Sequence, residues 1–455
     1  MIRSRIPGPR TPAAYARALR EFQRSLPHGL THLARTYGDV CAFGFGPART
    51  VFLFGPAANE RVLGDPDTFV FTGAYDMLLP IAGDTALVVT DGAPHDRVRR
   101  AARPAFGRAA VERATRLIVD QVDAAARAWA PGRRIDVYHE LREAVRTAMI
   151  HAFCGPELAR RRPELTTHLD RIHDLMDYPL PRQLLAWKLP GRARRRALDG
   201  VAGVESLVYA EIARRRRETA PGQTPDGDDL IGVMLRARAD DGSAMTDQEI
   251  RDMVVSALIA GYDPVSSGVG WAVYHLVSEP GVWETAREET VRVLGDRPAT
   301  PADARRLHYL GRVVYESMRL HPPVTMSPRR ALRAFTHDGH TVPAGSLVAV
   351  SQYVTHRLPH LWPDPDAFRP ERWDRDQPGH RMPTPFEYFP YGYGTRRCIG
   401  SGLAALVVPA VLSRLLQSTS LELLTTDPRP AGIPALFPRD GLPARVTTRT
   451  PAVHS

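Results

Sequence analysis

Cysteine is scarce in this chain of 455 residues, and its three copies, Cys41, Cys154 and Cys398, lie far apart. An odd number of widely spaced cysteines provides no disulfide framework, which excludes a small disulfide-stabilised secreted protein and favours a reducing cytoplasm. The stretch from Met1 to Pro9 also lacks an apolar run. We therefore expect a cytoplasmic protein with neither a signal peptide nor a membrane anchor.

A strong charge imbalance is absent as well, because 60 basic residues are accompanied by 50 acidic ones. The net charge of +10 could attract nucleic acid, an anionic membrane or an acidic protein. The sequence has no basic stripe interleaved with aromatic residues. We therefore do not expect nucleic acid to be a partner.

No internal repeat or clear domain boundary interrupts the chain, although its length makes two domains the ordinary expectation and one large core the alternative. Short helices are predicted over residues 14–22 and 30–37. Two apolar runs, 40–45 and 50–54, follow on either side of a glycine-rich turn and predict a small antiparallel hairpin. From about residue 110 onward the pattern is mostly helical.

A long apolar segment begins after the capping box Thr246-Asp-Gln-Glu249 and extends to about Val277. A helix that is apolar on nearly all sides has to cross the core. Pro264 lies in its middle, removes one backbone N–H and, together with Gly261, is expected to kink or open the helix. The neighbouring acid, Asp263, is either functional or a structural carboxylate with a hydrogen-bond partner.

The stretch from Tyr388 to Gly400 places three glycines, two adjacent arginines and Cys398 directly ahead of the apolar segment Leu403 to Leu416. A helix N-terminus favours negative charge and lowers the pKa of a thiol. Such a loop suits a cysteine that ligates a metal from one side. The alternative is that Cys398 is a small buried apolar residue.

Two further pairs have helical spacing. His95 and Arg99 are four residues apart on the helix that opens after Asp91, so together they could bind a carboxylate or phosphate, or could simply form a solvated face. Glu316 and Arg319 are three residues apart, close enough to form an ion pair within one helix.

Taken in order, these motifs resemble those of the cytochrome P-450 family of haem-thiolate monooxygenases, over roughly residues 30–416. Each motif alone is weak, but the ordered set is specific. It consists of His95-x-x-x-Arg99, Ala260-Gly261-x-Asp263, Glu316-x-x-Arg319 with Pro370-Glu-Arg372-Trp373, and Gly392-x-Gly394-x-Arg396-x-Cys398-x-Gly400. The resemblance implies a mostly α fold with small β-sheets. It also implies one triangular domain over residues 1–455, with a small N-terminal β region, a long central helix and a cysteine-loop haem site.

The resemblance also implies roles for individual residues. Cys398 would ligate the iron of haem b through its thiolate. Haem contacts would come from His95, Arg99, Arg329, Arg396, Gly392 and Gly400, with the basic residues neutralising the propionates. Glu316, Arg319 and Arg372 resemble a charged structural cluster behind the cysteine loop.

The main departure from the family pattern is Pro264, which occupies the position of a threonine whose hydroxyl helps to deliver protons during oxygen activation. Three explanations are open: Ser267 or an ordered water takes over, the substrate brings a hydroxyl, or oxygen is not activated conventionally. Gly261, Asp263 and Ser267 are accordingly the candidate catalytic residues. Tyr391 stands where phenylalanine is usual and could add a hydrogen bond near the thiolate, while Pro409 interrupts the following helix for no reason that the sequence reveals.

The predicted function is a bacterial-type monooxygenase that takes one oxygen atom from O₂ and inserts it into a lipophilic small molecule, a secondary metabolite. No flavin or nicotinamide domain is recognisable, so electrons would come from a ferredoxin or flavodoxin with its reductase, and the protein is expected to be a monomer. One alternative is a peroxide-dependent or non-oxidative haem-thiolate enzyme, which Pro264 motivates. The other is a non-catalytic haem binder.

Overall fold

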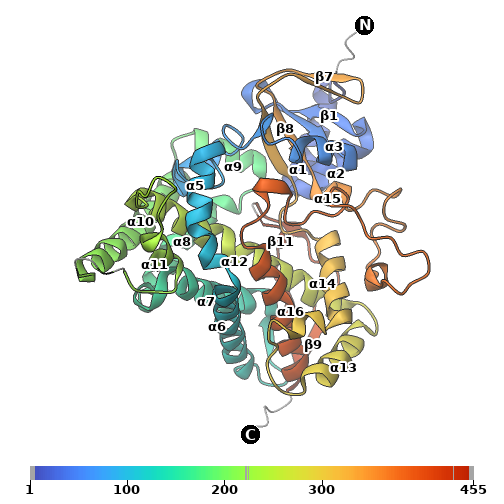
Figure 1. Ribbon diagram of the computed structural model, residues 1–455. Coiled ribbons are helices and arrows are strands. Elements are labelled where there is room, and N and C mark those ends of the chain that lie inside the picture. Colours follow the sequence, from blue (N-terminus) through green and yellow to red (C-terminus); the bar gives the residue numbers. More distant parts are fainter. Residues whose placement is uncertain (1–5, 221–222, 224, 434, 450–455) are drawn as a thin grey trace.

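One helix of 32 residues, α12 (Asp247–Ser278), runs through the middle of the protein in the computed structural model, which describes residues 6–220, 223, 225–433 and 435–449 (Figure 1). The predicted capping box is confirmed, because the Thr246 hydroxyl accepts from the Glu249 N–H at 3.1 Å and the Glu249 carboxylate accepts from the Thr246 N–H at 2.8 Å. Most of the helix is buried, so its length is explained by the core that it crosses.

Helices make up most of the fold, and they pack around α12, with α7, α10, α14 and α16 among its neighbours. The other helices are α1 (Pro12–Arg24), α2 (Leu26–Tyr37), α3 (Pro56–Leu63), α4 (Leu79–Ala82), α5 (Gly92–Ala102), α6 (Arg108–Arg127), α7 (Val137–Arg160), α8 (Arg162–Met176), α9 (Leu180–Lys188), α10 (Arg192–Glu218), α11 (Leu230–Arg236), α13 (Val282–Leu294), α14 (His308–Leu320), α15 (Gln352–Thr355) and α16 (Ser401–Ser418).

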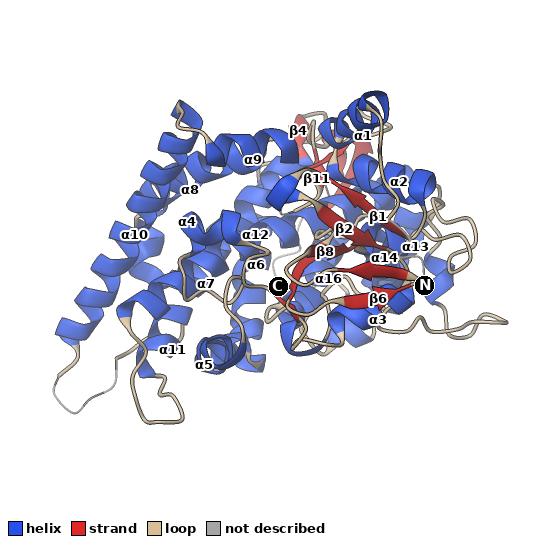
Figure 2. Cartoon of the chain, turned by 90° about the horizontal axis from the view of Figure 1, so that it is seen from above, coloured by secondary structure: helices blue, strands red, loops and turns tan. Residues whose placement is uncertain are grey.

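Strands gather toward one side of the molecule, while helices fill the other (Figure 2). The main sheet has the order β1-β2-β8-β5-β3. It is formed by β1 (Val40–Phe43), β2 (Thr50–Leu53), β3 (Phe69–Val70), β5 (Ser327–Ala331) and β8 (Leu347–Val350). The smaller sheets are β4 (Arg134–Asp136) with β12 (Pro443–Arg449) and β9 (Thr419–Leu423), β6 (Phe335–His337) with β7 (His340–Val342), and β10 (Pro430–Ala431) with β11 (Phe437–Pro438).

The predicted hairpin is confirmed as β1 and β2, which pair antiparallel with Val40 opposite Leu53 and Phe43 opposite Thr50. The parallel partner of β2 is β8, from a part of the chain almost 300 residues later, with Thr50 opposite Leu347. The N-terminal hairpin is therefore not a separate unit but one edge of a sheet completed by residues near position 350.

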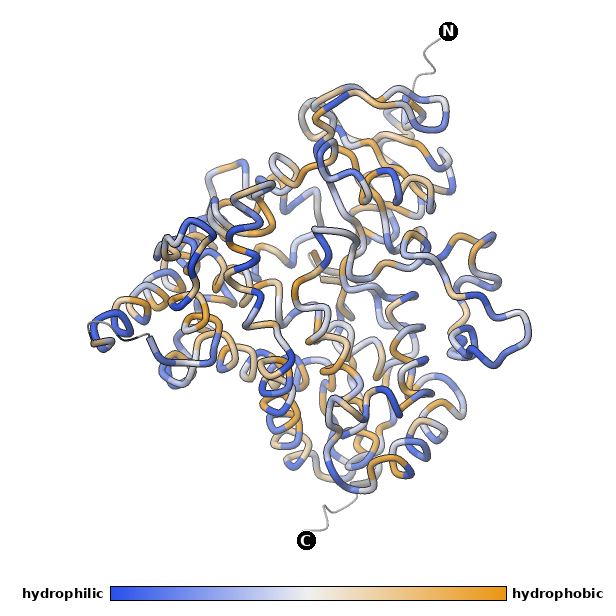
Figure 3. The backbone as a smooth tube through the Cα atoms, viewed as in Figure 1, coloured by the Kyte–Doolittle hydropathy of each residue, from blue (hydrophilic) through white to orange (hydrophobic). Residues whose placement is uncertain are grey.

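Hydrophobic residues are concentrated in the strands and on the inner turns of the helices, whereas the outlying C-terminal end of α10 is hydrophilic (Figure 3). Within the described residues, α16 is the one helix whose length and composition would allow it to cross a membrane, and 61% of it is buried inside the protein. The predicted mostly helical fold with small sheets and a three-cornered outline is confirmed (Figure 1).

The expected opening of the central helix at Pro264 does not occur, since α12 is helical on both sides of it. Side-chain contacts hold the neighbouring turns in place. The Ser266 hydroxyl donates to the Tyr262 carbonyl at 2.8 Å, and Trp271 Nε1 donates to the Leu436 carbonyl at 2.8 Å. Packing on both sides of the proline therefore outweighs the loss of one backbone hydrogen bond.

Candidate active site

The loop before α16 presents Cys398 at the position expected of a metal-ligating thiolate. Gly392 and Gly394 adopt φ angles of 70° and 65°, a region that side-chain-bearing residues rarely occupy. The loop then turns so that the Cys398 N–H donates to the Tyr391 carbonyl at 2.9 Å. Cys398 lies two residues before Gly400, the residue that caps the N-terminus of α16.

The thiol of Cys398 is accessible to solvent but closely surrounded by protein. Its side chain is exposed, yet the surrounding protein desolvates the thiol and raises its pKa. The Gly400 N–H and the guanidinium groups of Arg99 and Arg397 act in the opposite direction and lower the pKa. Hydrogen-bonding and cationic groups are thus already aimed at a developing thiolate, and a bound metal ion would complete its stabilisation.

The middle of α12 also faces open space, although the rest of the helix is buried. Ala260 is exposed and Gly261 and Pro264 are partly exposed, whereas Tyr262 and Asp263 on the other side are buried. Positions 260 and 264 are one turn apart, so they share a face. An exposed face in the middle of a core helix means that other side chains do not cover it.

Aromatic side chains connect the cysteine loop to α12. The ring of Phe106 lies 3.8 Å from where a side chain on Gly400 would begin, and it packs against Phe153 with ring centroids 5.9 Å apart. The Phe153 ring in turn lies 2.9 Å from where a side chain on Gly261 would begin. Gly261 therefore has no room for a larger residue, and the two phenylalanines form an apolar wall between Cys398 and α12.

Arg329 on β5 is a buried cation without an ionic partner. Its side chain forms no ion pair with a described carboxylate, and its Nη1 donates to the Pro328 carbonyl at 2.7 Å. Burial lowers its pKa, and the hydroxyl of Tyr75 partly compensates. The guanidinium lies 3.9 Å from the ring centroid of Phe71, and that of Arg396 lies 4.3 Å from the same ring.

The other predicted cations lie around the same position. Arg396 pairs with Asp91 and also donates to the Leu87 carbonyl at 3.2 Å. Arg99 donates to the Arg397 carbonyl at 2.7 Å and forms no ion pair with a described residue. Burial and then Arg396 lower the pKa of His95, so two of the predicted cations are close enough to affect each other.

This surplus of positive charge needs an anion. A buried guanidinium is costly unless it is paired, and a carboxylate is the anion that its planar geometry binds best. A haem group carries two carboxylate side chains on an apolar ring, with an iron for the thiolate. The cations, the apolar wall and Cys398 therefore fit haem. The sequence did not identify Tyr75 and Phe71 as part of this cradle, because their contacts with Arg329 are made between segments distant in sequence.

Behind the cysteine loop, Glu316 is surrounded by hydrogen-bond donors. Arg319 binds both of its oxygens at 2.8 Å, and Arg372 Nε lies 3.1 Å from Oε1. Trp373 Nε1 donates to Oε2 at 2.9 Å. The predicted cluster is confirmed, and it ties α14 to the irregular segment that leads to the cysteine loop.

Asp263, the candidate distal acid, is held by two basic groups that the sequence did not connect to it. Arg142 Nε on α7 lies 2.9 Å from Oδ1, and His173 Nε2 on α8 lies 2.7 Å from Oδ2. Burial alone would raise the pKa of Asp263, but His173 and Arg142 lower it below its usual value. No sequence signal links the three positions, because each comes from a different helix and they meet only through helix packing.

Ser267, the candidate substitute for the missing threonine, is fully buried, and its hydroxyl donates to the carbonyl of Leu436. That contact is shared with Trp271 and joins α12 to the loop before β11. Tyr391 does add a hydrogen bond, but its hydroxyl donates to the Met318 sulfur at 3.4 Å. The hydroxyl of Ser267 therefore already has an acceptor within the protein, and the hydroxyl of Tyr391 bonds to Met318 rather than to Cys398.

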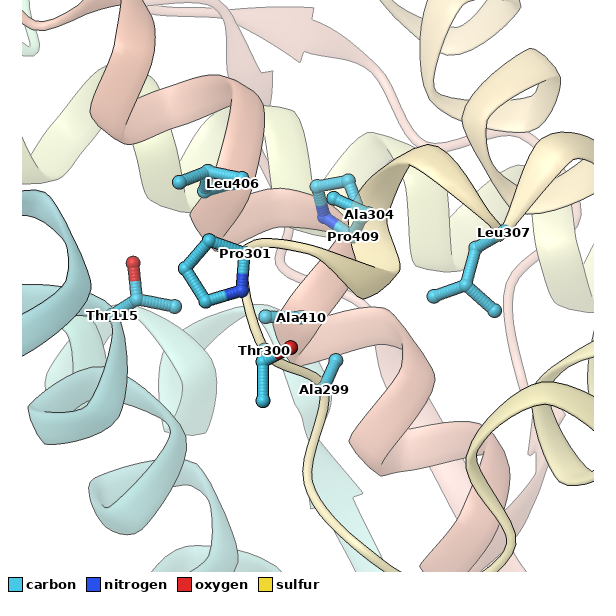
Figure 4. A pocket seen from close by; sticks show the side chains of 9 residues that line it. All are labelled: Thr115, Ala299, Thr300, Pro301, Ala304, Leu307, Leu406, Pro409 and Ala410. Carbon is cyan, nitrogen blue, oxygen red and sulfur yellow. The ribbon is translucent and has the colours of Figure 1, made fainter. Parts of the chain in front are cut away.

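Pro409 lies inside α16 without ending it. Together with Leu406 and Ala410 it faces Pro301 and Ala304 across a contact that leaves no room for a water molecule (Figure 4). Apolar groups line most of this contact, and it lies in the middle of α16 rather than at the cysteine loop. Pro409 therefore packs against the 299–304 segment and takes no part in the candidate site.

Comparisons with known proteins identify the family of this chain. The family model for cytochrome P-450 matches residues 7–440. Cytochrome P-450 139 of Mycobacterium tuberculosis is 37% identical over 430 residues, which cover 94% of this chain and 99% of that protein. The cyclooctat-9-en-7-ol 5-monooxygenase of Streptomyces melanosporofaciens is 32% identical, with 89% of this chain and 86% of that protein covered.

The fold is also that of a solved structure, retinoic acid bound cyanobacterial CYP120A1. The TM-score is 0.83 at 23% identity, and the match covers 92% of this chain and 94% of that one. The family match and the monooxygenase relatives make the protein a haem-containing oxidoreductase. The chain belongs to the cytochrome P-450 family of monooxygenases, whose cofactor is haem b.

Proposed function

We propose that the protein is a cytoplasmic, monomeric monooxygenase that inserts one oxygen atom from O₂ into a lipophilic small molecule, a secondary metabolite. Two electrons come singly from a ferredoxin or flavodoxin with its reductase. The balanced reaction converts a C–H bond, O₂, two electrons and two protons into a C–OH group and water. Haem supplies the iron at which oxygen is activated, and Cys398 is proposed as its thiolate ligand.

The observation that carries this proposal is the accessible thiol of Cys398, connected along an apolar wall to the exposed middle of α12. Arg329, Arg396, Arg99 and His95 are proposed to bind the propionates, and Gly392 and Gly400 to give the loop its close approach. Ala260, Phe153 and the backbone at Gly261 exclude water and leave an apolar surface for the substrate. The Streptomyces relative, whose name describes the oxidation of an alcohol with a hydrocarbon skeleton, supports a lipophilic substrate.

The purified protein tests the ligand assignment first. Its reduced carbon monoxide complex should show the strongly red-shifted Soret band of a thiolate ligand, and Cys398→Ala should lose that band. Cys41→Ala is the matched control, because Cys41 is buried in β1 away from the loop. A normal band in Cys398→Ala would refute the assignment.

Turnover tests the reaction itself. Lipophilic alcohols such as cyclooctat-9-en-7-ol, the compound in the name of the Streptomyces enzyme, are supplied with NADPH, ferredoxin and ferredoxin reductase under ¹⁸O₂ and should yield a product that carries one labelled oxygen. NADPH consumption that does not respond to any compound in the panel would contradict the proposed substrate class.

Pro264 favours a second candidate, a peroxide-dependent enzyme, because it removes the hydroxyl on which proton delivery in this family depends. In that reaction a C–H bond and H₂O₂ give a C–OH group and water. Turnover with hydrogen peroxide alone, compared with NADPH plus electron-transfer partners, separates the two candidates. Product oxygen that derives from O₂ together with substrate-dependent NADPH use would exclude the second.

A further inference from the structure

Three helices bring one acidic and two basic side chains together behind the exposed face of α12. Asp263 comes from α12, Arg142 from α7 and His173 from α8, with the distances of 2.9 Å and 2.7 Å given above. The side chains of Asp263 and His173 are only 10% and 6% exposed. Such a cluster has to be fully paired to be stable, and its protonation state follows from the geometry.

Both ring nitrogens of His173 face acceptors. Nδ1 lies 2.8 Å from the carbonyl oxygen of Leu169, one turn earlier in α8, and Nε2 lies 2.7 Å from the carboxylate oxygen of Asp263. Neither of these two acceptors carries a proton of its own, so each nitrogen donates to the acceptor that faces it. The hydroxyl oxygen of Tyr262 lies 3.0 Å from Nε2 and 3.2 Å from Nδ1 and is the third polar contact of the ring. A histidine that donates from both nitrogens is the charged imidazolium.

The surroundings of His173 agree with this assignment. Burial alone would lower its pKa, but Asp263 and the Leu169 carbonyl raise it above its ordinary value. The charged and titratable groups around the ring are Asp263 and Tyr262 on α12, Arg142 and Arg146 on α7, and Asp177 at the end of α8. The pKa of Tyr262 is raised well above its ordinary value by burial, so its hydroxyl is neutral.

The neighbouring residues of α12 leave a gap in proton delivery. Pro264 has no hydroxyl, and the hydroxyl of Ser267 already donates to the carbonyl of Leu436. Asp263 is held as a carboxylate by two cations, so it carries no proton of its own. Among the described residues, the Asp263 carboxylate contacts Arg142 Nε and His173 Nε2, so the proton beside it that is not on an arginine is the one on His173.

We propose that His173 is the positioning residue of the distal acid and that it stores, as an imidazolium, the proton that Asp263 relays to the exposed face of α12 at Ala260. The proton moves from Nε2 to Oδ2 and leaves a neutral imidazole beside a carboxylic acid. The acid then releases the proton toward that face, and the imidazole takes a replacement from solvent. Asp177, an exposed carboxyl at the end of α8, is within electrostatic reach of His173.

Arg142 has a different part in the same cluster. A guanidinium keeps its proton at every accessible pH, so Arg142 fixes the carboxylate in place without supplying a proton. Its second contribution is to compensate the Asp263 carboxylate after the acid has released its proton and before His173 is protonated again. In this cluster His173 stores the proton, and Arg142 compensates the negative charge.

The first test reads the charge of His173 without turnover. Protein labelled with ¹³C at histidine Cε1, loaded with haem and held in the diamagnetic reduced carbon monoxide form, is titrated by NMR, and the His173 signal is assigned from its loss in His173→Gln. The signal should stay that of an imidazolium well above pH 6.5, and Asp263→Asn should lower its titration midpoint. A neutral ring at pH 6.5 in the wild-type protein would overturn the proposal.

The second test reads the coupling of NADPH use to product, and for this readout the inference rests on the proposed function. We expect wild-type coupling to fall as the pH rises through the midpoint measured by NMR, and His173→Gln to be about tenfold less coupled and independent of pH in that range. The matched control is His168→Gln on the same helix, which should keep wild-type coupling. A pH profile in His173→Gln that matches the wild type would overturn the proposal.

The two tests can fail separately. If the wild-type protein shows no substrate-dependent use of O₂, the proposed function fails, while the NMR titration still decides whether His173 is charged. If the enzyme turns over but His173→Gln raises KM and leaves coupling unchanged, His173 only shapes the substrate site, and the proposed proton storage is wrong.

Discussion

Glu316 and Arg319 form a two-point ion pair on α14 in which both side chains are completely buried, with N–O distances of 2.8 Å at each contact. The remaining donors of Arg319 are also satisfied, because Nη1 donates to the carbonyls of His356 at 2.9 Å and Pro365 at 2.6 Å. The pair therefore links α14 to two loop segments near the cysteine loop. It has no route to substrate, so its contribution is to stability.

Removing the acid from this pair should be severely destabilising. Glu316→Ala leaves the buried Arg319 guanidinium without its counter-charge, and we expect it to lower the free energy of unfolding by about 3–5 kcal/mol in urea titrations. Glu316→Gln, which keeps one acceptor oxygen, should cost less. The exposed neighbour Glu371→Ala is the control and should change stability by less than about 0.5 kcal/mol. A cost for Glu316→Ala near that of the control would contradict the structural role.

Arg329 should behave in the opposite way in the haem-free protein. Because Arg329 is buried and pairs with no carboxylate in the part of the chain that the structure describes, Arg329→Leu should leave the stability of the apoprotein unchanged or raise it. The same change should speed haem loss at least about tenfold, since it removes a charge-assisted hydrogen bond worth roughly 1.5–3 kcal/mol.

Haem transfer to an excess of a haem-scavenging apoprotein measures that rate. Arg333→Leu, at an exposed position four residues further on, is the matched control. Equal rates of haem loss in the two variants would remove Arg329 from the propionate site.

Local patterns explain why so much of the fold could be predicted. The capping box at Thr246 and the apolar runs of β1 and β2 depend on neighbours in sequence, and both are confirmed. The pairing of Glu316 with Arg319 follows from helical spacing alone. The partners of Asp263 could not be predicted, because Arg142 and His173 reach it from helices that are about 120 and 90 positions away in the sequence.

The conformation at Pro264 is a second case in which contacts between distant segments limit what local sequence patterns can predict. Sequence rules predict a kink or an opening because they count the lost hydrogen bond. The structure keeps the helix unbroken, so the opening does not occur, while a kink of the helix axis stays a prediction. Contacts of Tyr262 and Trp271 with distant segments fix the turns on either side. Packing against distant segments keeps α12 continuous at Pro264. A single sequence read from local patterns does not show which distant segments pack together.

Ser267→Ala distinguishes a structural hydroxyl from a proton-transferring one. The Leu436 carbonyl keeps a second donor in Trp271 Nε1, so we expect a cost of only about 1 kcal/mol in unfolding free energy and little change in coupling. Ser266→Ala, which removes a hydroxyl bound to the Tyr262 carbonyl within the same helix, is the control. A tenfold loss of coupling confined to Ser267→Ala would support the catalytic role predicted from the sequence.

Pro264→Thr tests whether conventional oxygen chemistry is native to this site. The substitution restores a hydroxyl and a backbone N–H on the face that includes Ala260, without requiring a new backbone conformation, because the helix is already continuous. If O₂ is the native oxidant, the fraction of NADPH electrons recovered in product should rise. No gain, or loss of all activity, would indicate a site shaped around the proline.

The pH dependence of stability gives an independent measure of the His173 charge. The pKa of His173 is raised in the folded state, so its stabilising contribution is fully present below about pH 6.5, the unfolded value, and is lost as the pH rises through the folded value. Each unit of that increase corresponds to about 1.4 kcal/mol. The difference in unfolding free energy between the wild type and His173→Gln should therefore be largest in mildly acidic solution and should shrink in alkaline solution.

A double-mutant cycle assigns this effect to the ion pair with Asp263. In an Asp263→Asn background the histidine has lost its anionic partner, so the further change His173→Gln should no longer remove a stabilising contribution that depends on pH between 6 and 9. Urea titrations of the four proteins across this range supply the measurement. If the pH dependence persists without Asp263, the charge of His173 is maintained by another group, and Asp263 cannot be the residue that receives its proton.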